Sequence, residues 1–299
     1  HYNFLKKHGV PTIIYVNKMD KEYIHFEELL EEIKVKIGKT AVSFVYPIGH
    51  EEQFDGFINV VTLKARHYNG TECVDDIIYD DKKAKILALH NIITEQVALT
   101  DEALLEKFFG GETLSMEEIH HGLHAAVLKG DITPVLVGSA KKDIGIHTML
   151  SMLIEYLPNP NELNPYTGTT PDGKEVIRKT LSSEPFSAYV FKTMFDQYKG
   201  QTNIVKICSG SLSLGDEVFC PNTQETIKIA SMFFLSGNKQ ITTTKVNAGD
   251  IVALAKMESV VTGYTLCDKN EPITYPKAKF PTAVYFKAFA PVNPKDEEK

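Results

Sequence analysis

The segment Thr12-Ile13-Ile14-Tyr15-Val16-Asn17-Lys18-Met19-Asp20 decides the fold that we expect for this chain. Residues 11–16 are apolar and rich in β-branched side chains, which is typical of a strand buried in a parallel sheet. The strand ends in polar side chains, and open α/β sheets bind ligands at the carboxyl ends of their strands. The residues that follow predict a helix that ends at Gly38, with apolar side chains at helical spacing at Phe26, Leu29, Leu30, Ile33 and Ile37.

A second strand that ends in polar residues occurs further along the chain. Thr133–Val137 is apolar and is followed by Gly138-Ser139-Ala140-Lys141. We expect Asp143 to cap the next helix, which Pro158 ends, and whose apolar face holds Ile146, Met149, Leu150, Leu153 and Leu157. Two strand–helix units of this kind are typical of a doubly wound α/β domain.

Both strand ends carry a guanine-binding signature of GTPases: Asn-Lys-x-Asp at residues 17–20 and Ser-Ala-Lys at residues 139–141. The Asp20 carboxylate can accept hydrogen bonds from guanine N1–H and the 2-amino group. Adenine offers no such pair of donors, so it would leave a buried acceptor unpaired, which discriminates strongly between the bases. The alternative for Asp20 is a helix N-cap.

Composition indicates a protein of about two domains, because 299 residues with 43% hydrophobic and 24% charged side chains can bury two cores. No apolar run approaches the ~18 residues of a membrane span, and the first residues lack a signal-peptide pattern. The chain opens on His1, inside an expected helix that Gly9 ends, so we interpret it as an excised fragment. Its four cysteines form no Cys-x-x-Cys pair, which favours reduced thiols and a cytoplasmic location: Cys73, Cys208, Cys220 and Cys267.

An acidic α+β insert is expected at residues 42–133, which carry 16 acidic and 7 basic residues, while the remainder has 23 and 25. Strands are predicted at 42–48 and 57–67, with Asn69-Gly70 as a hairpin turn, and helices at 81–98, 101–108 and 115–129. A net charge of −9 suggests a surface for a protein partner, or a solvated face kept for solubility. His120 and His124 have the spacing of metal ligands, but no third ligand is evident. We therefore expect these histidines to lie on a solvated face of their helix rather than to bind a metal.

Short strands dominate the last part of the chain. Residues 158–184 are rich in Pro, Asn, Thr and Gly and predict a linker. Gly-containing turns then separate strands that we expect to form a closed antiparallel barrel, at residues 186–194, 202–209, 217–220, 226–232, 246–248 and 251–255. One more strand is predicted at 282–289, where a third domain would begin.

With these segments the chain resembles translational GTPases of the elongation factor G type, over about residues 1–290. Besides the two guanine signatures, the resemblance depends on Tyr46-Pro47-Ile48-Gly49, Phe54-Asp55-Gly56, Leu157-Pro158-Asn159-Pro160, Ser209-Gly210-Ser211-Leu212, Gly215-Asp216, Ala248-Gly249-Asp250-Ile251 and Thr262-Gly263-Tyr264-Thr265-Leu266. Residues 196–200 depart from the form that this segment usually has in elongation factor G, so an elongation factor G-like paralogue remains an alternative. The resemblance implies the carboxyl-terminal part of a GTPase domain (1–41 and 134–165), an insert (42–133), a β-barrel second domain (166–275) and the start of a third domain (276–299).

The resemblance also implies roles for six residues. Asn17 and Asp20 would read guanine edges, while Lys18 would pack along the base. Ser139 and Ala140 would offer backbone donors to O6, and Lys141 would cover the other face. No catalytic residue and no metal ligand is assigned. A phosphate loop, Gly-x-x-x-x-Gly-Lys-[Ser/Thr], does not occur in the sequence, so we expect no GTP hydrolysis by this fragment and only weak binding of GTP or GDP, if any. For the whole protein the resemblance implies GTP or GDP with magnesium.

The implied function is that of a ribosome-associated elongation factor that couples GTP hydrolysis to the movement of tRNA and mRNA. Alternatives are a ribosomal-protection or peptide-release GTPase, or a ribosome-binding paralogue that does not hydrolyse nucleotide. The resemblance further implies that the insert meets ribosomal stalk proteins and that the barrel lies against the small subunit, in a monomeric protein without a membrane partner.

Overall fold

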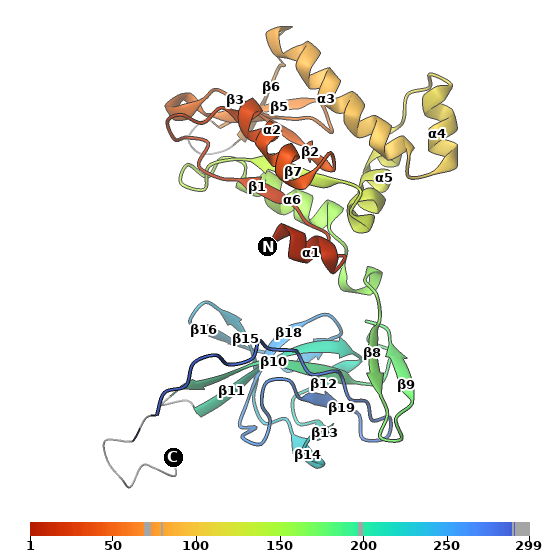
Figure 1. Cartoon of the computed structure of the whole chain (residues 1–299), viewed down its shortest axis with the longest axis vertical. Helices are drawn as coiled ribbons and strands as arrows, with labels where there is room; N and C mark the ends of the chain where they lie inside the picture. The colour runs from red at the N-terminus through yellow and green to blue at the C-terminus, as the bar shows by residue number, and fades with distance from the viewer. Residues whose placement is uncertain (69–72, 79, 197–199, 289, 291–299) are drawn as a thin grey trace. The chain divides into compact units, whose positions relative to one another are not determined.

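The computed structural model describes residues 1–68, 73–78, 80–196, 200–288 and 290 (Figure 1). The chain divides into two compact units, residues 1–159 and 160–299, and each is described by itself. The first is a mixed α/β unit and the second is built from antiparallel strands, so the expected fold class is confirmed.

A three-stranded parallel sheet forms the base of the first unit. Its order is β1 (Ile14–Val16), β7 (Thr133–Val137) and β2 (Ala41–Ser43). The central strand, β7, is buried along its whole length, as its continuous apolar sequence predicts. The prediction of one strand at 42–48 is wrong, because these residues belong to two strands. Strand β2 pairs with β7 in the parallel sheet, whereas β3 (Val45–Ile48) belongs to an antiparallel sheet.

Three helices accompany this sheet: α1 (Tyr2–Lys7), α2 (Phe26–Ile37) and α6 (Ile146–Tyr156). Gly9 and Gly38 follow the first two with positive φ angles, 64° and 107°, as expected of glycines after a helix. The Asp143 cap that we predicted is wrong, and the alternative role of Asp20 as an N-cap is also ruled out. Helix α2 begins after His25, so Asp20 is no N-cap, and Gly145 rather than Asp143 precedes α6.

The insert contains a four-stranded antiparallel sheet in chain order, β3, β4 (Gly56–Asn59), β5 (Lys64–Tyr68) and β6 (Cys73–Asp76). The predicted strand at 57–67 is in fact the hairpin β4–β5. Asn59 makes the turn, because its side-chain oxygen accepts from the backbone N–H groups of Val61 and Thr62. The predicted Asn69-Gly70 turn lies outside the described residues.

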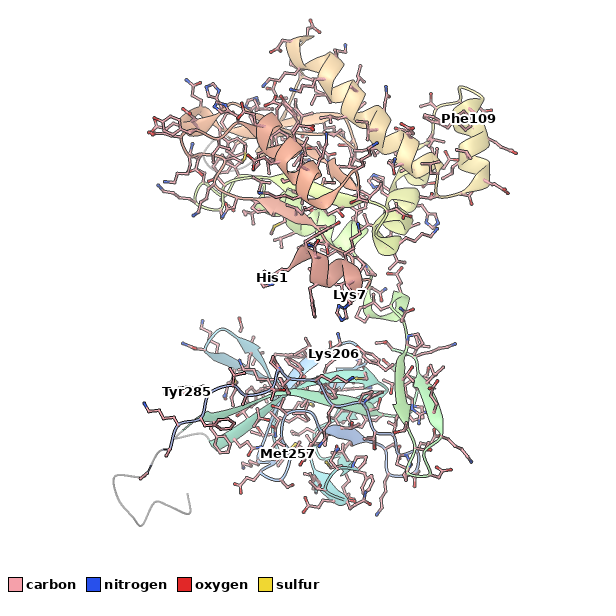
Figure 2. All side chains as sticks on the ribbon, in the orientation of Figure 1. His1, Lys7, Phe109, Lys206, Met257 and Tyr285 are labelled. Atoms are coloured by element: carbon pink, nitrogen blue, oxygen red, sulfur yellow. The ribbon has the colours of Figure 1, made fainter. Side chains whose placement is uncertain are left out.

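The helices of the insert match the sequence expectation closely. They are α3 (Asp80–Ala98), α4 (Glu102–Phe109) and α5 (Met116–Lys129). Asp101 caps α4, and Ser115 forms a capping box with Glu118 at the start of α5. Figure 2 shows Phe109 on the projecting helix α4, where its side chain is 80% exposed.

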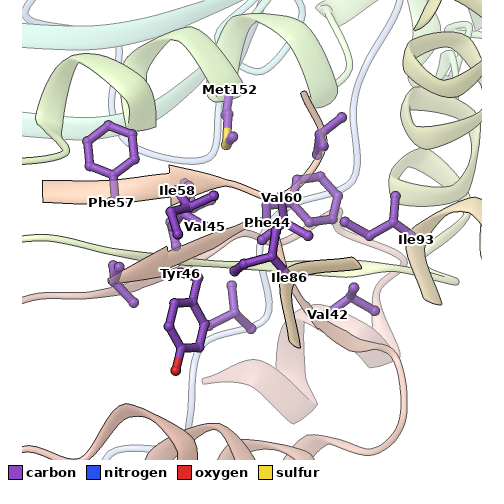
Figure 3. Close-up of a cluster of buried hydrophobic side chains, with 14 of the residues drawn as sticks. Val42, Phe44, Val45, Tyr46, Phe57, Ile58, Val60, Ile86, Ile93 and Met152 are labelled. Carbon is purple, nitrogen blue, oxygen red and sulfur yellow. The ribbon is translucent and has the colours of Figure 1, made fainter. Parts of the chain in front are cut away.

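One hydrophobic core joins the insert to the parallel sheet (Figure 3). Phe44, between β2 and β3, is fully buried and meets the ring of Tyr156 from α6 edge-on at 5.4 Å. Ile86 and Ile93 of α3 are buried in the same cluster. Because strands and helices from both parts share this core, the insert and the parallel sheet pack as one body.

The second unit contains one eight-stranded antiparallel sheet, a two-stranded ribbon and a separate hairpin. The sheet order is β14 (Glu225–Lys228), β13 (Glu217–Cys220), β19 (Thr265–Cys267), β10 (Ser187–Asp196), β11 (Gly200–Ser209), β18 (Ile251–Ala255), β15 (Met232–Ser236) and β16 (Lys239–Thr242). The ribbon joins β12 (Ser211–Ser213) to β17 (Lys245–Asn247). Strands β14 and β16 stand at the two ends of this order and do not pair with each other, so the described strands of the sheet do not form a closed ring.

Three further expectations for this unit need correction. The predicted linker contains a hairpin, β8 (Tyr166–Thr169) and β9 (Glu175–Arg178). The predicted strand at 226–232 divides into β14 and β15, because these lie near opposite ends of the sheet order. Residues 282–288 form no strand, and side chains such as Val284 are exposed; Phe289 lies outside the described residues.

Across the described residues, no helix combines the length and the apolar character that crossing a bilayer requires. The thiols of Cys208, Cys220 and Cys267 are free and buried. Burial raises the pKa of Cys208 to about 12 and that of Cys267 to about 11, so both stay protonated at neutral pH. The side chain of Cys73 lies outside the described residues.

Candidate guanine-binding site

The two loops that carry the guanine signatures lie side by side because β1 and β7 are adjacent parallel strands. Their last residues, Val16 and Val137, are paired, so both loops leave the same edge of the sheet. Two backbone hydrogen bonds join the loops directly: Gly138 N–H donates to the Val16 carbonyl at 3.0 Å, and Met19 N–H donates to the Gly138 carbonyl at 3.2 Å. The strand pairing thus places the two motifs together, as expected of this sheet edge.

Asp20 is held by the second loop. The Ser139 hydroxyl, fully buried, donates to Asp20 Oδ1 at 2.6 Å. This hydrogen bond, helped by the nearby Lys142 and Lys21 charges, holds the pKa of Asp20 below its usual value. Asp20 is therefore an ionised acceptor at neutral pH, which suits a carboxylate that meets two N–H donors of a base.

Asn17 closes the other side of the site. Its Oδ1 accepts from Lys18 N–H at 2.8 Å and from Ala140 N–H at 2.9 Å. The Ala140 N–H, expected to face guanine O6, is therefore engaged by Asn17 in this structure. A base would have to share or replace that hydrogen bond.

Lys18 and Lys141 are both exposed, at the start of the first loop and the end of the second signature. Lys18 adopts a positive φ of 68°, a backbone conformation that costs about 1 kcal/mol or more for a residue with a side chain. All six predicted residues thus belong to the two adjoining loops.

Sequence reasoning missed three residues that shape the site. A Cβ on Gly138 would come within 2.1 Å of the Tyr15 hydroxyl and 2.4 Å of the Ile144 carbonyl, so only glycine fits. Tyr15 donates to that same carbonyl at 3.4 Å, and burial, helped by the Asp143 charge, raises its pKa to about 12. The third is Lys142, whose side chain reaches the insert. A Gly directly after an apolar strand was the available signal for Gly138.

The histidines of α5 do not form a metal centre in the described part of the chain, which holds no cluster of three suitable ligands. His120 instead contacts the Tyr156 hydroxyl at 3.0 Å, and its ring stacks on the Tyr156 ring. His120 therefore joins α5 to α6.

Comparison with known families agrees with this geometry. Residues 1–159, more than half of the chain, match the family described as elongation factor Tu GTP binding domain. The chain belongs to this family. Residues 185–269 match the family described as elongation factor G domain 2. This match covers the eight-stranded sheet and its ribbon. The order of the two matches is that of a translational GTPase of the elongation factor type.

A solved structure shares the arrangement of elements. A crystal structure of a protein from Thermus thermophilus superposes with a TM-score of 0.78 and 23% sequence identity, covering 94% of this chain. The chain spans only 40% of the length of that protein. At this identity the likeness shows the fold alone.

Proposed function

We propose that this chain binds guanine nucleotide between the Asn17–Asp20 and Ser139–Lys141 loops, as part of a ribosome-associated elongation GTPase of the elongation factor G type. The observation that carries this proposal is the hydrogen bond between Ser139 and Asp20, which fixes an ionised carboxylate at the sheet edge where both loops meet. The family match over residues 1–159 supports it.

The base-reading chemistry follows from the acceptor at Asp20. A carboxylate has about four lone-pair positions, and Ser139 uses one, so the others can accept guanine N1–H and the 2-amino group. Asn17 and the Ala140 N–H would meet the O6 and N7 edge, while the stems of Lys18 and Lys141 would cover the two faces of the base. Together these groups recognise a purine that has donors at N1 and C2, which is guanine.

In the whole protein the nucleotide would be GTP or GDP with magnesium bound to its phosphates. We assign no residue of this chain to the metal or to the hydrolytic step. The proposed activity of the whole protein is GTP hydrolysis coupled to translocation of tRNA and mRNA. Ribosomal-protection and peptide-release GTPases, and a non-hydrolysing ribosome-binding paralogue, remain the alternatives.

A GDP titration tests the base-reading proposal. Because these residues would contact the base alone, affinity in the millimolar range is expected, and NMR amide shifts suit such weak binding. GDP should shift the signals of residues 17–20 and 139–142, while ADP at equal concentration should leave them in place. Equal shifts with both nucleotides would contradict the proposal.

We further propose that the protein is a cytoplasmic monomer, that its insert contacts stalk proteins, and that the second unit faces the small ribosomal subunit. The net charge of −9 over residues 42–133 and the exposed Phe109 support a protein contact on the insert. Titration with the carboxyl-terminal domain of a stalk protein should shift insert signals, and less so in high salt, since the Debye length is about 8 Å at 0.15 M. Shifts confined to residues 160–288 would contradict this contact.

A further inference from the structure

A short loop of the insert, residues 49–55, contacts residues just beyond both guanine signatures, Tyr23 and Lys142. It joins β3 to β4 and contains one turn of 3-10 helix, η1 (Glu51–Gln53). The loop is tightly folded at its start, because Gly49 has a φ of 75° and a Cβ there would lie 1.9 Å from the Gln53 carbonyl oxygen. At its end, Phe54 is fully buried. This loop therefore has a defined shape against which other groups can be positioned.

Lys142 is the contact from the second guanine loop. Its Nζ donates to the backbone carbonyls of Glu52 at 2.7 Å and Phe54 at 3.3 Å. The 3-10 turn itself uses the carbonyls of His50 and Glu51, and the last carbonyls of a short helix need other donors. An ammonium group suits them, because it also complements the negative end of the helix.

The same lysine connects back to the base reader. Its backbone N–H donates to Ser139 Oγ at 3.3 Å, and that hydroxyl donates to Asp20. A continuous chain of hydrogen bonds thus runs from the insert loop, through Lys142 and Ser139, to the carboxylate that would accept the guanine donors.

The segment that follows the first guanine loop has its own contact with the insert. Tyr23 N–H donates to Glu51 Oε1 at 3.0 Å. Tyr23 and Glu51 both adopt positive φ angles, 64° and 51°, although neither is glycine. The hydrogen bond thus joins two residues that each adopt a strained backbone conformation.

We propose that Lys142 is a positioning residue of the guanine site, which holds the Ser139–Lys142 loop on residues 49–55 and thereby couples base binding to the conformation of the insert loop. This inference rests on the proposed guanine-binding function. Lys142 lies outside the Ser-Ala-Lys signature, and its partners are backbone atoms of the insert. Coupling between two sites is reciprocal, so a change at the insert loop alters guanine affinity just as guanine alters the loop.

The test compares Lys142→Ala with the full 299-residue chain by NMR titration with GDP. In the unaltered chain, GDP shifts the amide signals of residues 139–142 and also those of residues 50–55. In Lys142→Ala the shifts at 50–55 become clearly smaller, since only the Tyr23–Glu51 contact remains, and the dissociation constant for GDP rises about tenfold, as expected when the hydrogen bonds of one charged group are lost. Lys142→Arg keeps the charge and the donors, so it restores part of both effects.

Lys36→Ala is the matched control, because it removes a lysine that is 77% exposed on α2, in the same unit. It should reproduce the unaltered chain. If Lys142→Ala binds GDP with unchanged affinity and shifts residues 50–55 as much as the unaltered chain does, the positioning role is wrong while the guanine site stands. If the unaltered chain does not distinguish GDP from ADP, the proposed function itself is wrong, and the coupling fails with it.

Discussion

The Ser139 hydroxyl donates a 2.6 Å hydrogen bond to Asp20 Oδ1, joining two residues that are 119 positions apart in the sequence. Ser139 is fully buried, whereas Asp20 is partly open to solvent. The serine side chain therefore faces the carboxylate from the protein interior, and it orients an acceptor for a ligand. This is a different use of Ser139 from the backbone contact with O6 that the resemblance implies.

Replacing Ser139 by alanine should raise the pKa of Asp20, because the hydroxyl hydrogen bond is the main cause of its lowered value. The carboxylate would then hold its proton to a higher pH than in the unaltered protein. A pH titration of the Asp20 carboxyl ¹³C signal measures this. Ser151→Ala, at an exposed position on α6, should leave that titration unchanged, and an unshifted Asp20 midpoint in Ser139→Ala would argue against the assigned hydrogen bond.

Gly138→Ala should disrupt the second guanine loop. The new methyl group would collide with the Ile144 carbonyl, which accepts from Ser139 N–H at 2.9 Å. Overpacking of this kind costs roughly 1–3 kcal/mol of unfolding free energy. Hydrogen-exchange mass spectrometry should show faster exchange at residues 138–145, with residues 160–288 as the internal reference. Unchanged exchange at 138–145 would mean that the loop accommodates the methyl group.

Glu27→Gln should weaken the packing of α2 on the insert. Burial alone would raise the pKa of Glu27, but hydrogen bonds from Lys85 at 2.6 Å and from Tyr46 outweigh it and lower the pKa to about 2. Because the pKa of Glu27 in the folded state is lower than its unfolded value of 4.5, the ionised carboxylate stabilises the folded protein above about pH 4.5. This stabilisation is lost as the pH falls toward 2. Because the Glu27 side chain is half exposed, we expect about 1 kcal/mol at neutral pH.

Urea unfolding at several pH values measures this effect. The difference between Glu27→Gln and the unaltered protein should be largest above about pH 4.5 and should shrink toward pH 2. Glu32→Gln, at a side chain that is 67% exposed on the same helix, should show little effect. A Glu27→Gln difference that grows on acidification would contradict the assigned pKa direction.

Residues 160–278 should be more stable by themselves than residues 185–270. The longer segment keeps the β8–β9 hairpin and its buried partners Ile273 and Tyr275. The Tyr275 hydroxyl contacts Ser187 Oγ at 2.7 Å. Burial of two such side chains contributes roughly 3 kcal/mol or more. Urea unfolding of the two segments compares them. Equal stabilities would show that the hairpin contributes nothing to this unit.

The parallel strands, the helices and the two guanine loops could be predicted because each has a local sequence signal. Val16 and Val137 end apolar runs, and the polar residues after them sit together because the strands are neighbours. The cap of α6 was predicted wrongly. Asp143 has the right chemistry for a cap, but its φ of 57° places it within the tight loop before Gly145.

The remaining errors come from partners that are distant in the sequence. The β8–β9 hairpin lies in a segment rich in Pro and Gly, and Gly168 packs against Ile273, where a Cβ would come within 2.6 Å. Residues 282–288 have strand-like composition but no partner strand among the described residues. Lys142 could not be predicted, since its acceptors are backbone carbonyls, which every sequence provides.

Asp20→Asn asks whether Asp20 reads the guanine base. Xanthine replaces the 2-amino group of guanine by a carbonyl, so it presents one donor and one acceptor where guanine presents two donors. An asparagine amide matches that pair, with Oδ1 accepting and Nδ2 donating. The exchange should weaken GDP binding and strengthen binding of xanthosine diphosphate, each about tenfold, as expected for one hydrogen bond to a charged group.

The decisive measurement is the ratio of the dissociation constants for GDP and xanthosine diphosphate, from NMR titrations of the unaltered chain, Asp20→Asn and Asp131→Asn. Asp131 is exposed and lies before the opposite end of β7, so its replacement controls for the lost charge. We predict a preference for GDP in the unaltered chain and in Asp131→Asn, and a preference for xanthosine diphosphate in Asp20→Asn. An Asp20→Asn protein that still prefers GDP would contradict the assignment of Asp20 as the base reader.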